Sequence, residues 1–315
     1  MALTIGVDVG GTKIAAGVVG EDGTLLEECR RETPAHDFQA TELAIVDVIA
    51  SLRKRHEVEA IGIGAAGYVD ADRATVLFAP NLGWRDVPLR SDIDAHIEIP
   101  VVIENDANAA AWGEFRFGAG ADVDDLLMVA VGTGVGGGIV IRGELIRGSF
   151  GVAAEIGHFR LVPNGVPCHC GQQGCLEQYA SGSALVRDAR ARVAAEDPQA
   201  RPLLDAAGGD PASINGPLVT SLAVQHDPMC VDLLEDLGRW LGEGLASLAT
   251  VLDPGVVVIG GGVSEAAELL LTPVRDAYAA FLPARQHHPH PELRLATLGN
   301  EAGMIGAADL ARTPG

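Results

Sequence analysis

The chain has 315 residues, 48% of them hydrophobic, so it can bury a sizeable core, and this length usually means two domains. Its 22 basic and 43 acidic residues give a formal net charge of -21, which argues against nonspecific binding to nucleic acid or to an anionic membrane. No apolar stretch approaches the roughly 20 residues of a membrane span, and we expect no signal peptide. Five cysteines, three of them clustered, favour a reducing compartment, so we expect a cytoplasmic protein.

The first half of the chain predicts a strand meander that is followed by helices and further strands. Short apolar runs predict strands, and one stripe of apolar residues predicts a helix over 41–55. A further helix begins near Asn105 or Asp106. The expected strands are 3–9, 14–20, 24–31, 60–66, 99–104, 126–131 and 138–146. The last two strands repeat the N-terminal meander, which indicates an internal duplication.

The second half begins with a loop-like segment over 158–180 and continues as a mostly helical region over 183–253. Leucines between Leu234 and Leu252 recur every three or four residues, which predicts a core or domain-spanning helix. Residues 197–216 are rich in Pro, Gly, Ala and Asp and predict an exposed loop. The remaining expected elements are a strand over 256–259, a helix opening at Val263–Ser264, a strand over 293–298 and a helix over 302–311.

Glycine-rich turns follow three apolar strands, at Gly10–Gly11, at residues 132–138 and at residues 260–262. Glycine allows a sharp bend that brings backbone N–H groups close to an anion, so two such loops could hold a polyphosphate. Each of the first two turns could by itself be an ordinary hairpin, and neither of these two matches a Walker or a dinucleotide-binding pattern. Asp8 ends the first strand, where a carboxylate would suit a hydrated Mg²⁺ ion, and Lys13 follows the turn. These side chains favour the phosphate interpretation.

Three cysteines lie close together at Cys168, Cys170 and Cys175, with glycines that permit a tight bend. Zinc takes four tetrahedral ligands, usually Cys or His, so we expect a structural zinc site. His158 is the preferred fourth ligand and His169 is the alternative. Three free cysteines or a redox pair are the other interpretations. The histidines between 287 and 290 stand among prolines and indicate an exposed loop.

Several carboxylates and amides suit a polyhydroxylated substrate. Phosphoryl transfer to an alcohol needs a base, and an apolar strand delivers Asp106 to the first turn of an Ala-rich helix, where the helix dipole would keep it ionised. Asp106 could equally be only an N-cap, although Asn105 could take that place. Glu155 and Glu177 flank the cysteine cluster, and Asn81 adds an amide in a turn.

The segments 8–13, 132–137 and 168–175 together resemble the sugar kinases and repressors of the repressor, open reading frame, kinase (ROK) family, over essentially the whole chain. The segments 81–84 and 104–106 are most similar to those of its ATP-dependent glucokinases. The resemblance implies two ribonuclease-H-like (actin- or hexokinase-like) α/β domains with a central cleft. It places residues 1–118 and about 302–315 in a small N-terminal domain, and residues 119–301, with the zinc loop 158–180, in a larger one.

The resemblance also implies roles for individual residues. Asp106 is the general base for transfer of the γ-phosphoryl group of ATP to the 6-hydroxyl of D-glucose, and Asp8 lies near Mg²⁺. His158 serves both zinc and sugar. The candidate sugar contacts are Gly67, Asn81, Asn105, Asp106, Glu155, His158 and Glu177. The candidate nucleotide contacts are Asp8, Gly10, Gly11, Thr12, Lys13, Thr133, Gly134, Gly260, Gly261 and Gly262. The candidate zinc ligands are His158, Cys168, Cys170 and Cys175.

Other functions within the family stay open. A kinase for fructose, mannose or N-acetylmannosamine would share these hydroxyl-binding residues, and polyphosphate could replace ATP as donor. A non-catalytic sugar-sensing regulator is the other alternative. Repressors of the family carry an added N-terminal helix-turn-helix domain, whereas this chain begins directly at the Asp8 strand and is acidic, so we expect no nucleic-acid partner. The family implies a homodimer or homotetramer and a place in carbohydrate metabolism and glycolysis.

Overall fold

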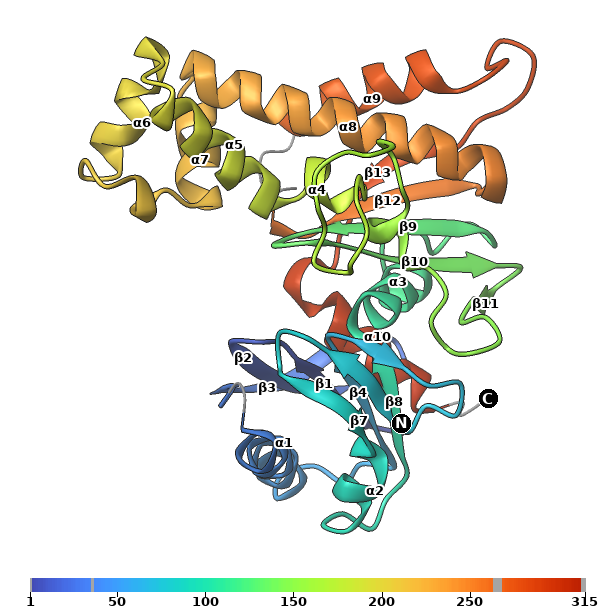
Figure 1. Ribbon diagram of the computed structural model, residues 1–315. Coiled ribbons are helices and arrows are strands. Elements are labelled where there is room, and N and C mark those ends of the chain that lie inside the picture. Colours follow the sequence, from blue (N-terminus) through green and yellow to red (C-terminus); the bar gives the residue numbers. More distant parts are fainter. Residues whose placement is uncertain (1, 35–36, 263–267, 313–315) are drawn as a thin grey trace. The chain divides into compact units, whose positions relative to one another are not determined.

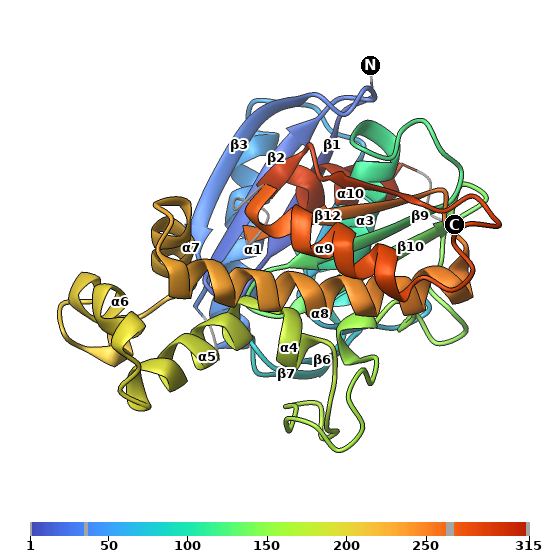
Figure 2. The same cartoon turned by 90° about the horizontal axis from the view of Figure 1, so that it is seen from above.

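A computed structural model describes residues 2–34, 37–262 and 268–312 (Figures 1 and 2). The chain is of the α/β class, as predicted, and its contacts divide it into two compact units. Unit 1 comprises Met1–Met128, Gly137–Ala154 and Ala296–Gly315, and unit 2 comprises Val129–Gly136 and Glu155–Leu295. These units are defined by contacts, and their boundaries do not coincide with the domain boundary expected after residue 118. The division into two domains that the sequence indicates therefore stays a prediction.

Unit 1 is built around a five-stranded sheet of order β3-β2-β1-β4-β8. The predicted meander is present, since β1 pairs antiparallel with β2 and β2 with β3, while β1 and β4, and β4 and β8, run parallel. The elements are β1 (Thr4–Val9), β2 (Lys13–Val19), β3 (Leu25–Glu32), α1 (Phe38–Arg53), β4 (Ala60–Ala65), α2 (Leu89–Asp94), β8 (Val101–Asn105), α3 (Asp106–Phe117), η5 (Gly299–Glu301) and α10 (Ala302–Leu310).

The two faces of this sheet pack differently. On one face, alternate apolar residues such as Val7 and Ile63 join α1 and α2 in the main core of unit 1. On the other face, glycines allow α10 to approach the sheet closely. A Cβ atom at Gly6 or at Gly62 would lie 1.8 Å from a backbone oxygen of α10. Helix α10 is therefore packed directly against β1 and β4, the strands that lie beside each other at the centre of this sheet.

A small antiparallel sheet of order β5-β6-β7, which the sequence pattern did not predict, follows β4 within unit 1. Its strands are β5 (Tyr68–Val69), β6 (Val76–Ala79) and β7 (Trp84–Val87). The strands are too short to give a clear alternation of apolar and polar residues, which explains why they were missed. The turn between β5 and β6 places Asp70 and Arg73 beside the central sheet, and the Ile103 N–H of β8 donates to the Arg73 carbonyl at 3.1 Å.

A second five-stranded sheet has the order β11-β10-β9-β12-β13. Its strands are β9 (Leu126–Val131), β10 (Val135–Ile141), β11 (Glu144–Leu145), β12 (Val256–Gly260) and β13 (Glu292–Leu295). Two expectations need correction. Gly136 to Gly138 lie inside β10, so the turn occupies only residues 132–134, and the strand expected over 293–298 ends at Leu295. The unit boundaries fall within β9 and β10.

The helices of unit 2 include one long amphipathic helix, α8 (Pro228–Leu252), whose predicted leucine stripe is buried at Leu234, Leu237, Leu241 and Leu245. Gly242 permits close packing of the neighbouring α9, because a Cβ atom there would lie 2.4 Å from the Val274 carbonyl oxygen. The other helices are η1 (Ile156–His158), α4 (Glu177–Ala180), α5 (Gly182–Ala194), α7 (Gly216–Val224) and α9 (Glu268–Phe281).

The segment 197–216 is mostly exposed, as expected, but the expectation of a loop is wrong. This segment forms three short helices, η2 (Pro198–Ala200), α6 (Arg201–Ala206) and η3 (Pro211–Ser213). The two 3-10 helices of this segment, η2 and η3, each have proline in the first turn. The side chains of Asp197 and Asp210 cap them. The helix start expected at Val263–Ser264 lies outside the described residues. Within the residues that the structure describes, no helix is long and apolar enough to cross a membrane.

Candidate active site and candidate metal centre

Two carboxylates meet at the carboxyl ends of the parallel strands of unit 1. Asp8 of β1 pairs in register with Gly64 of β4, which pairs with Glu104 of β8. The chain then continues through Asn105 to Asp106, the first residue of α3. Because parallel strands end at the same edge of a sheet, Asp8 and Asp106 come close enough for the charge of Asp8 to act on Asp106.

Asn105, and not Asp106, is the N-cap of α3. The Asn105 Oδ1 atom accepts a hydrogen bond from the Asn108 N–H at 2.9 Å, and its Nδ2 atom donates to the Gly67 carbonyl at 3.0 Å. Of the two roles that the sequence allowed for Asp106, the N-cap is therefore excluded. The Asp106 Oδ1 atom accepts from the Ala107 N–H at 2.9 Å, which orients the carboxylate in the first turn.

The electrostatic setting makes Asp106 a stronger base than an ordinary aspartate. Burial and then the nearby charge of Asp8 raise the pKa of Asp106 to about 6. Burial also raises the pKa of Asp8, and the Lys13 ammonium group opposes this shift. A carboxylate with a pKa close to neutrality is suited to accept a proton from a substrate hydroxyl. A cation with a preference for oxygen ligands would relieve the repulsion between the two carboxylates.

The first glycine turn joins β1 to β2 in unit 1. The Gly10 N–H donates to the Lys13 carbonyl at 3.0 Å, and the Thr33 hydroxyl donates to the Gly10 carbonyl at 2.7 Å. A Cβ atom at Gly11 would lie 3.4 Å from Asn81, so this candidate sugar contact lies against the turn. Neither Gly10 nor Gly11 has a left-handed φ. The advantage of glycine here is the bare backbone, not an unusual dihedral angle.

The second glycine turn, in unit 2, lies directly against a candidate sugar contact. The Val135 N–H donates to the Glu177 Oε2 atom at 3.1 Å. A Cβ atom at Gly134 would lie 2.3 Å from that same oxygen, so glycine is needed for the carboxylate to come this close. A Cβ atom at Gly132 would meet nothing within 4 Å. The turn is thus packed on one side and open on the other.

The third glycine turn follows β12. Gly261 has a φ of +88°, and a Cβ atom there would lie 2.4 Å from the Val131 carbonyl oxygen. Glycine is required at this position by both the dihedral angle and the close approach to β9. A Cβ atom at Gly262 would meet nothing within 4 Å, so this glycine leaves open space. Both the second and the third turns therefore present bare backbone with room for a ligand.

The cysteine cluster forms as predicted, with His158 as its fourth member. One ligand atom from each of His158, Cys168, Cys170 and Cys175 lies within 4.8 Å of all the others, and His169 is not in the group. The Cys170 and Cys175 sulfur atoms are 3.6 Å apart, and the His158 Nδ1 atom is 3.6 Å from the Cys168 sulfur. Tetrahedral zinc with Zn–S bonds of about 2.3 Å needs sulfur atoms roughly 3.8 Å apart. The donor set therefore fits zinc.

The fold around the cluster explains how these ligands converge. Gly174 has a φ of +80°, and a Cβ atom there would lie 1.6 Å from the Val162 carbonyl oxygen, so the chain turns back tightly before Cys175. The Tyr179 hydroxyl accepts from the Val166 N–H at 2.8 Å and ties the loop to α4. Burial and the neighbouring thiols raise the pKa of Cys175 to about 12. A thiolate there needs a cation beside it.

The same loop brings Glu155 and Glu177 into a fixed relation to the cluster. The Glu155 carbonyl accepts from the His158 N–H at 3.0 Å across η1, and Glu177 begins α4 two residues after Cys175. A Cβ atom at Gly157 would lie 2.0 Å from the Val135 carbonyl oxygen, so η1 is packed tightly on the start of β10. Contacts within unit 2 thus connect η1, the start of α4 and the second glycine turn. The histidines at 287, 288 and 290 are exposed, as expected.

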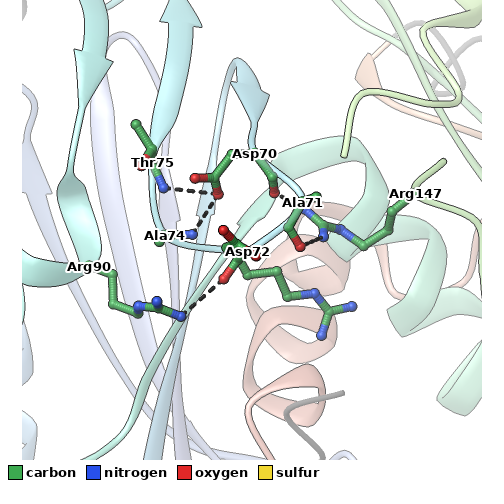
Figure 3. Close-up of a pocket in the computed structure, with 8 residues that line it drawn as sticks. Asp70, Ala71, Asp72, Ala74, Thr75, Arg90 and Arg147 are labelled. Carbon is green, nitrogen blue, oxygen red and sulfur yellow. Dashed lines mark hydrogen bonds between the residues drawn. The ribbon is translucent and has the colours of Figure 1, made fainter. Parts of the chain in front are cut away.

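Sequence reasoning missed one group of charged residues in unit 1. Glu104 is buried and forms ion pairs with Arg73 and Arg147. The two arginines line an open pocket of about 640 Å³, drawn in Figure 3, which contains none of the predicted site residues. The pocket is lined by Asp70, Ala71, Asp72, Arg73, Ala74, Thr75, Arg90 and Arg147. A glutamate within an apolar strand, two residues before the candidate base, was the signal that could have revealed this group.

Comparison with known proteins tests the resemblance. A glucokinase of Streptomyces coelicolor is 51% identical over 318 residues, which cover 100% of this chain and 99% of that protein. A crystal structure of a ROK family glucokinase from Streptomyces griseus, in complex with glucose and AMPPNP, is 52% identical and covers 99% of both chains with a TM-score of 0.91. The ROK hexokinase from Thermus thermophilus is 37% identical and covers 98% of both, with a TM-score of 0.83. A sequence model of the ROK family matches residues 4–314. This chain therefore belongs to the ROK family.

Proposed function

We propose that this protein is an ATP-dependent glucokinase that transfers the γ-phosphoryl group of ATP to the 6-hydroxyl group of D-glucose. The observation that carries the chemistry is Asp106, a carboxylate fixed in the first turn of α3 with a pKa raised to about 6. The full-length similarity to the Streptomyces glucokinases supports glucose as the acceptor and ATP as the donor. Asp106 accepts the hydroxyl proton as the oxygen attacks the γ-phosphorus atom, and the bond from that phosphorus to the oxygen bridging it to the β-phosphate breaks, so that ADP leaves.

The sugar is held by the residues named from the sequence. The Asn105 side chain can still accept one further hydrogen bond and donate one, because its bonds to Asn108 and Gly67 use only part of its amide. Asn81 and Gly67 would also contact the sugar. The other hydroxyl groups are bound by Glu155, His158 and Glu177. The Glu177 carboxylate also accepts from the Val135 N–H, which supports a role in aligning the sugar with the phosphate loop.

ATP is bound by the three glycine turns. Bare backbone at Gly132 and Gly262, where a Cβ atom would meet open space, supports binding of phosphate and adenosine groups there. Thr12, Lys13, Thr133 and Gly134 complete the phosphate contacts. Asp8 is the carboxylate that would face Mg²⁺, which when bound neutralises charge on the β- and γ-phosphates. The raised pKa of Asp8 supports this role, because burial without a cation disfavours its charged form.

A structural zinc ion is bound by His158, Cys168, Cys170 and Cys175. Four protein ligands fill a tetrahedral site, so the metal holds the loop in shape and leaves no position for water. The His158 Nδ1 atom faces the sulfur atoms, which supports use of its other ring nitrogen for a sugar hydroxyl. By this proposal the zinc loop sets the positions of Glu155 and Glu177 before sugar arrives. We also expect a homodimer or homotetramer, which light scattering would measure.

The test is ADP release from ATP and Mg²⁺ in zinc-loaded protein against glucose, mannose, fructose, N-acetylmannosamine and N-acetylglucosamine. We expect kcat/KM for glucose to exceed that for each other sugar. A preference for another sugar would keep the chemistry and overturn glucose as the substrate. Sugar binding without turnover on ATP, followed by turnover on polyphosphate, would overturn the donor. Sugar binding without turnover on either donor would support a regulator.

A further inference from the structure

Glu104 is a charged residue that the proposed mechanism does not use, and it is almost completely buried. Its side chain is 1% exposed, and it lies at the end of β8, two residues before Asp106. A buried carboxylate is costly unless both of its oxygen atoms have partners. The two oxygen atoms of Glu104 have different partners. One binds the first turn of α3, and the other faces two arginines.

The Oε1 atom of Glu104 binds the first turn of α3. It accepts a hydrogen bond from the Asn105 N–H at 2.9 Å and from the Asn108 Nδ2 atom at 3.2 Å. The Asn108 N–H in turn donates to the Asn105 Oδ1 atom at 2.9 Å. These three bonds link the residue before Asp106 with the residue two positions after it. The backbone that carries Asp106 is therefore enclosed by a ring of hydrogen bonds through Glu104.

The Oε2 atom of Glu104 faces two arginines. The Nε atom of Arg147 lies 2.7 Å away and that of Arg73 lies 3.3 Å away, and these side chains are only 11% and 16% exposed. Neither the Arg147 Nε atom nor the Glu104 Oε2 atom forms an aligned hydrogen bond, so the attraction is one of charge. Two cations around one buried anion balance the charge that burial would otherwise disfavour.

Both arginines are anchored by contacts that do not involve Glu104. Arg147 donates from Nη1 to the Ala71 carbonyl at 2.9 Å and from Nη2 to the Asp70 carbonyl at 2.8 Å (Figure 3). Arg73 has a φ of +53°, and its carbonyl accepts from the Ile103 N–H of β8. A non-glycine residue in this region is strained and is held there by its surroundings. The Arg147 guanidinium group and the Arg73 backbone are thus held in place by contacts that do not depend on Glu104.

We propose that Glu104, held by Arg147 and Arg73, is a positioning residue that fixes Asp106 in the orientation required for phosphoryl transfer. This inference rests on the proposed role of Asp106 as the base. Glu104 itself is buried behind the first turn of α3 and acts through Asn105 and Asn108. A catalytic group displaced by about 1 Å can lose on the order of a hundredfold in rate. A change at Glu104 or Arg147 should therefore appear in kcat.

The test compares Glu104→Gln and Arg147→Met with Arg90→Met as the matched control. Arg90 lines the same pocket and donates to the Asp72 carbonyl at 3.0 Å, but it has no contact with Glu104 in the described structure. We expect kcat to fall about tenfold or more in the first two variants, while KM for ATP stays within about twofold. Arg90→Met should leave kcat unchanged. Arg147→Lys, which keeps the cation, should recover most of the loss.

A purely structural role gives a different result. It would lower the melting temperature and the fraction of active protein, but kcat per folded active site would not change. The double variant Glu104→Gln with Arg147→Met removes the closer ion pair as a whole, so that only Arg73, the more exposed of the two arginines, loses its carboxylate partner. If both residues act through one link, the double variant should be no slower than the slower single variant. Losses that multiply, or equal kcat in Arg147→Met and Arg90→Met, would overturn the inference.

Asp106→Asn, measured beside these variants, separates this inference from the proposed function. Loss of turnover in Asp106→Asn without loss in Glu104→Gln and Arg147→Met would overturn the positioning role alone. Retained turnover in Asp106→Asn would overturn the base and the positioning role with it. If the wild-type protein phosphorylates no sugar, hydrogen exchange can still test whether Arg147 stabilises the first turn of α3. Faster exchange of the amides of residues 105–109 in Arg147→Met than in Arg90→Met supports the link, and equal exchange overturns it.

Discussion

The two candidate centres of this molecule are held in place by different means. The carboxylate centre of unit 1, Asp8 and Asp106, stands at the ends of paired strands and at the start of a capped helix. The cysteine centre of unit 2 stands in a loop that contains two isolated bridges, at Arg160–Cys175 and Pro167–Gln173. Regular secondary structure provides the frame that carries the carboxylates of the first centre. A loop of this kind needs a cross-link, which four converging metal ligands would supply.

The electrostatics of the two centres follow the same division. Burial and a neighbouring carboxylate raise the pKa of Asp106, so its charged form is disfavoured and its proton affinity is useful. Burial and neighbouring thiols raise the pKa of Cys175, so its charged form depends on a cation. Under the proposed function, the first centre would use its raised pKa in the reaction, and the second would use a metal to hold the chain. Variants of each centre can test these two roles separately.

The largest effect is expected from Asp106→Asn. The amide keeps the Oδ1 acceptor for the Ala107 N–H but cannot take a proton from the sugar, so kcat should fall by ~10²-fold or more. Steady-state kinetics with glucose and ATP measure this. Asp94→Asn, at the end of α2 in the same unit, is the matched control and should keep wild-type kcat. Near-normal turnover in Asp106→Asn would show that strand ends do not place the base here.

The next largest effect is expected from Cys170→Ser, which removes one ligand of the cysteine centre. Bound zinc should fall from about one equivalent toward none, and kcat/KM for glucose should fall by about 10- to 100-fold because Glu155 and Glu177 lose their fixed positions. Zinc content by mass spectrometry and sugar kinetics measure the two changes. Cys29→Ser, a free thiol on β3, is the control. Full activity in metal-free Cys170→Ser would mean that the loop keeps its shape without a cross-link.

A smaller effect is expected from pH. Because Asp106 acts as a base only when ionised, kcat/KM for glucose should fall about tenfold for each pH unit below the pKa of about 6. Since the charge of Asp8 contributes to that shift, Asp8→Asn should move the acidic limb of the profile to lower pH even where it reduces the rate. A limb that stays in place would mean that the carboxylates of the first centre do not interact.

Sequence reasoning succeeded where a residue type and its spacing determine the geometry. Three closely spaced cysteines and a histidine ten residues upstream predicted the group of metal ligands. The glycines between the cysteines indicated the tight bend that brings the thiols together. Capping chemistry likewise offered Asn105 as an alternative N-cap, and the structure shows that choice. The meander and its glycine turns were predicted for the same reason, since strand period and turn chemistry are local.

Contacts between distant segments could not be predicted from one sequence. The pairing of Glu104 with Arg147 joins residues 43 positions apart and depends on how the turn after β5 packs on β8. The approach of Glu177 to Gly134 is of the same kind. The short helices over 197–216 were missed for another reason, because a composition typical of loops also supplies proline first turns and aspartate caps.

The smallest effect concerns stability and tests the first centre without any substrate. The pKa of Asp106 is raised in the folded state from 3.8 to about 6, so its stabilising contribution is fully present below pH 4 and is lost as pH rises through 6. The ionised carboxylate then costs up to about 3 kcal/mol at pH 8, against about 0.5 kcal/mol gained from the helix dipole. Asp106→Asn should therefore melt a few degrees higher than the wild type at pH 8, and the difference should shrink toward zero near pH 4. A lower melting temperature at pH 8 would mean that Asp106 is stabilised as an anion, and the carboxylate centre would then resemble an ordinary helix cap.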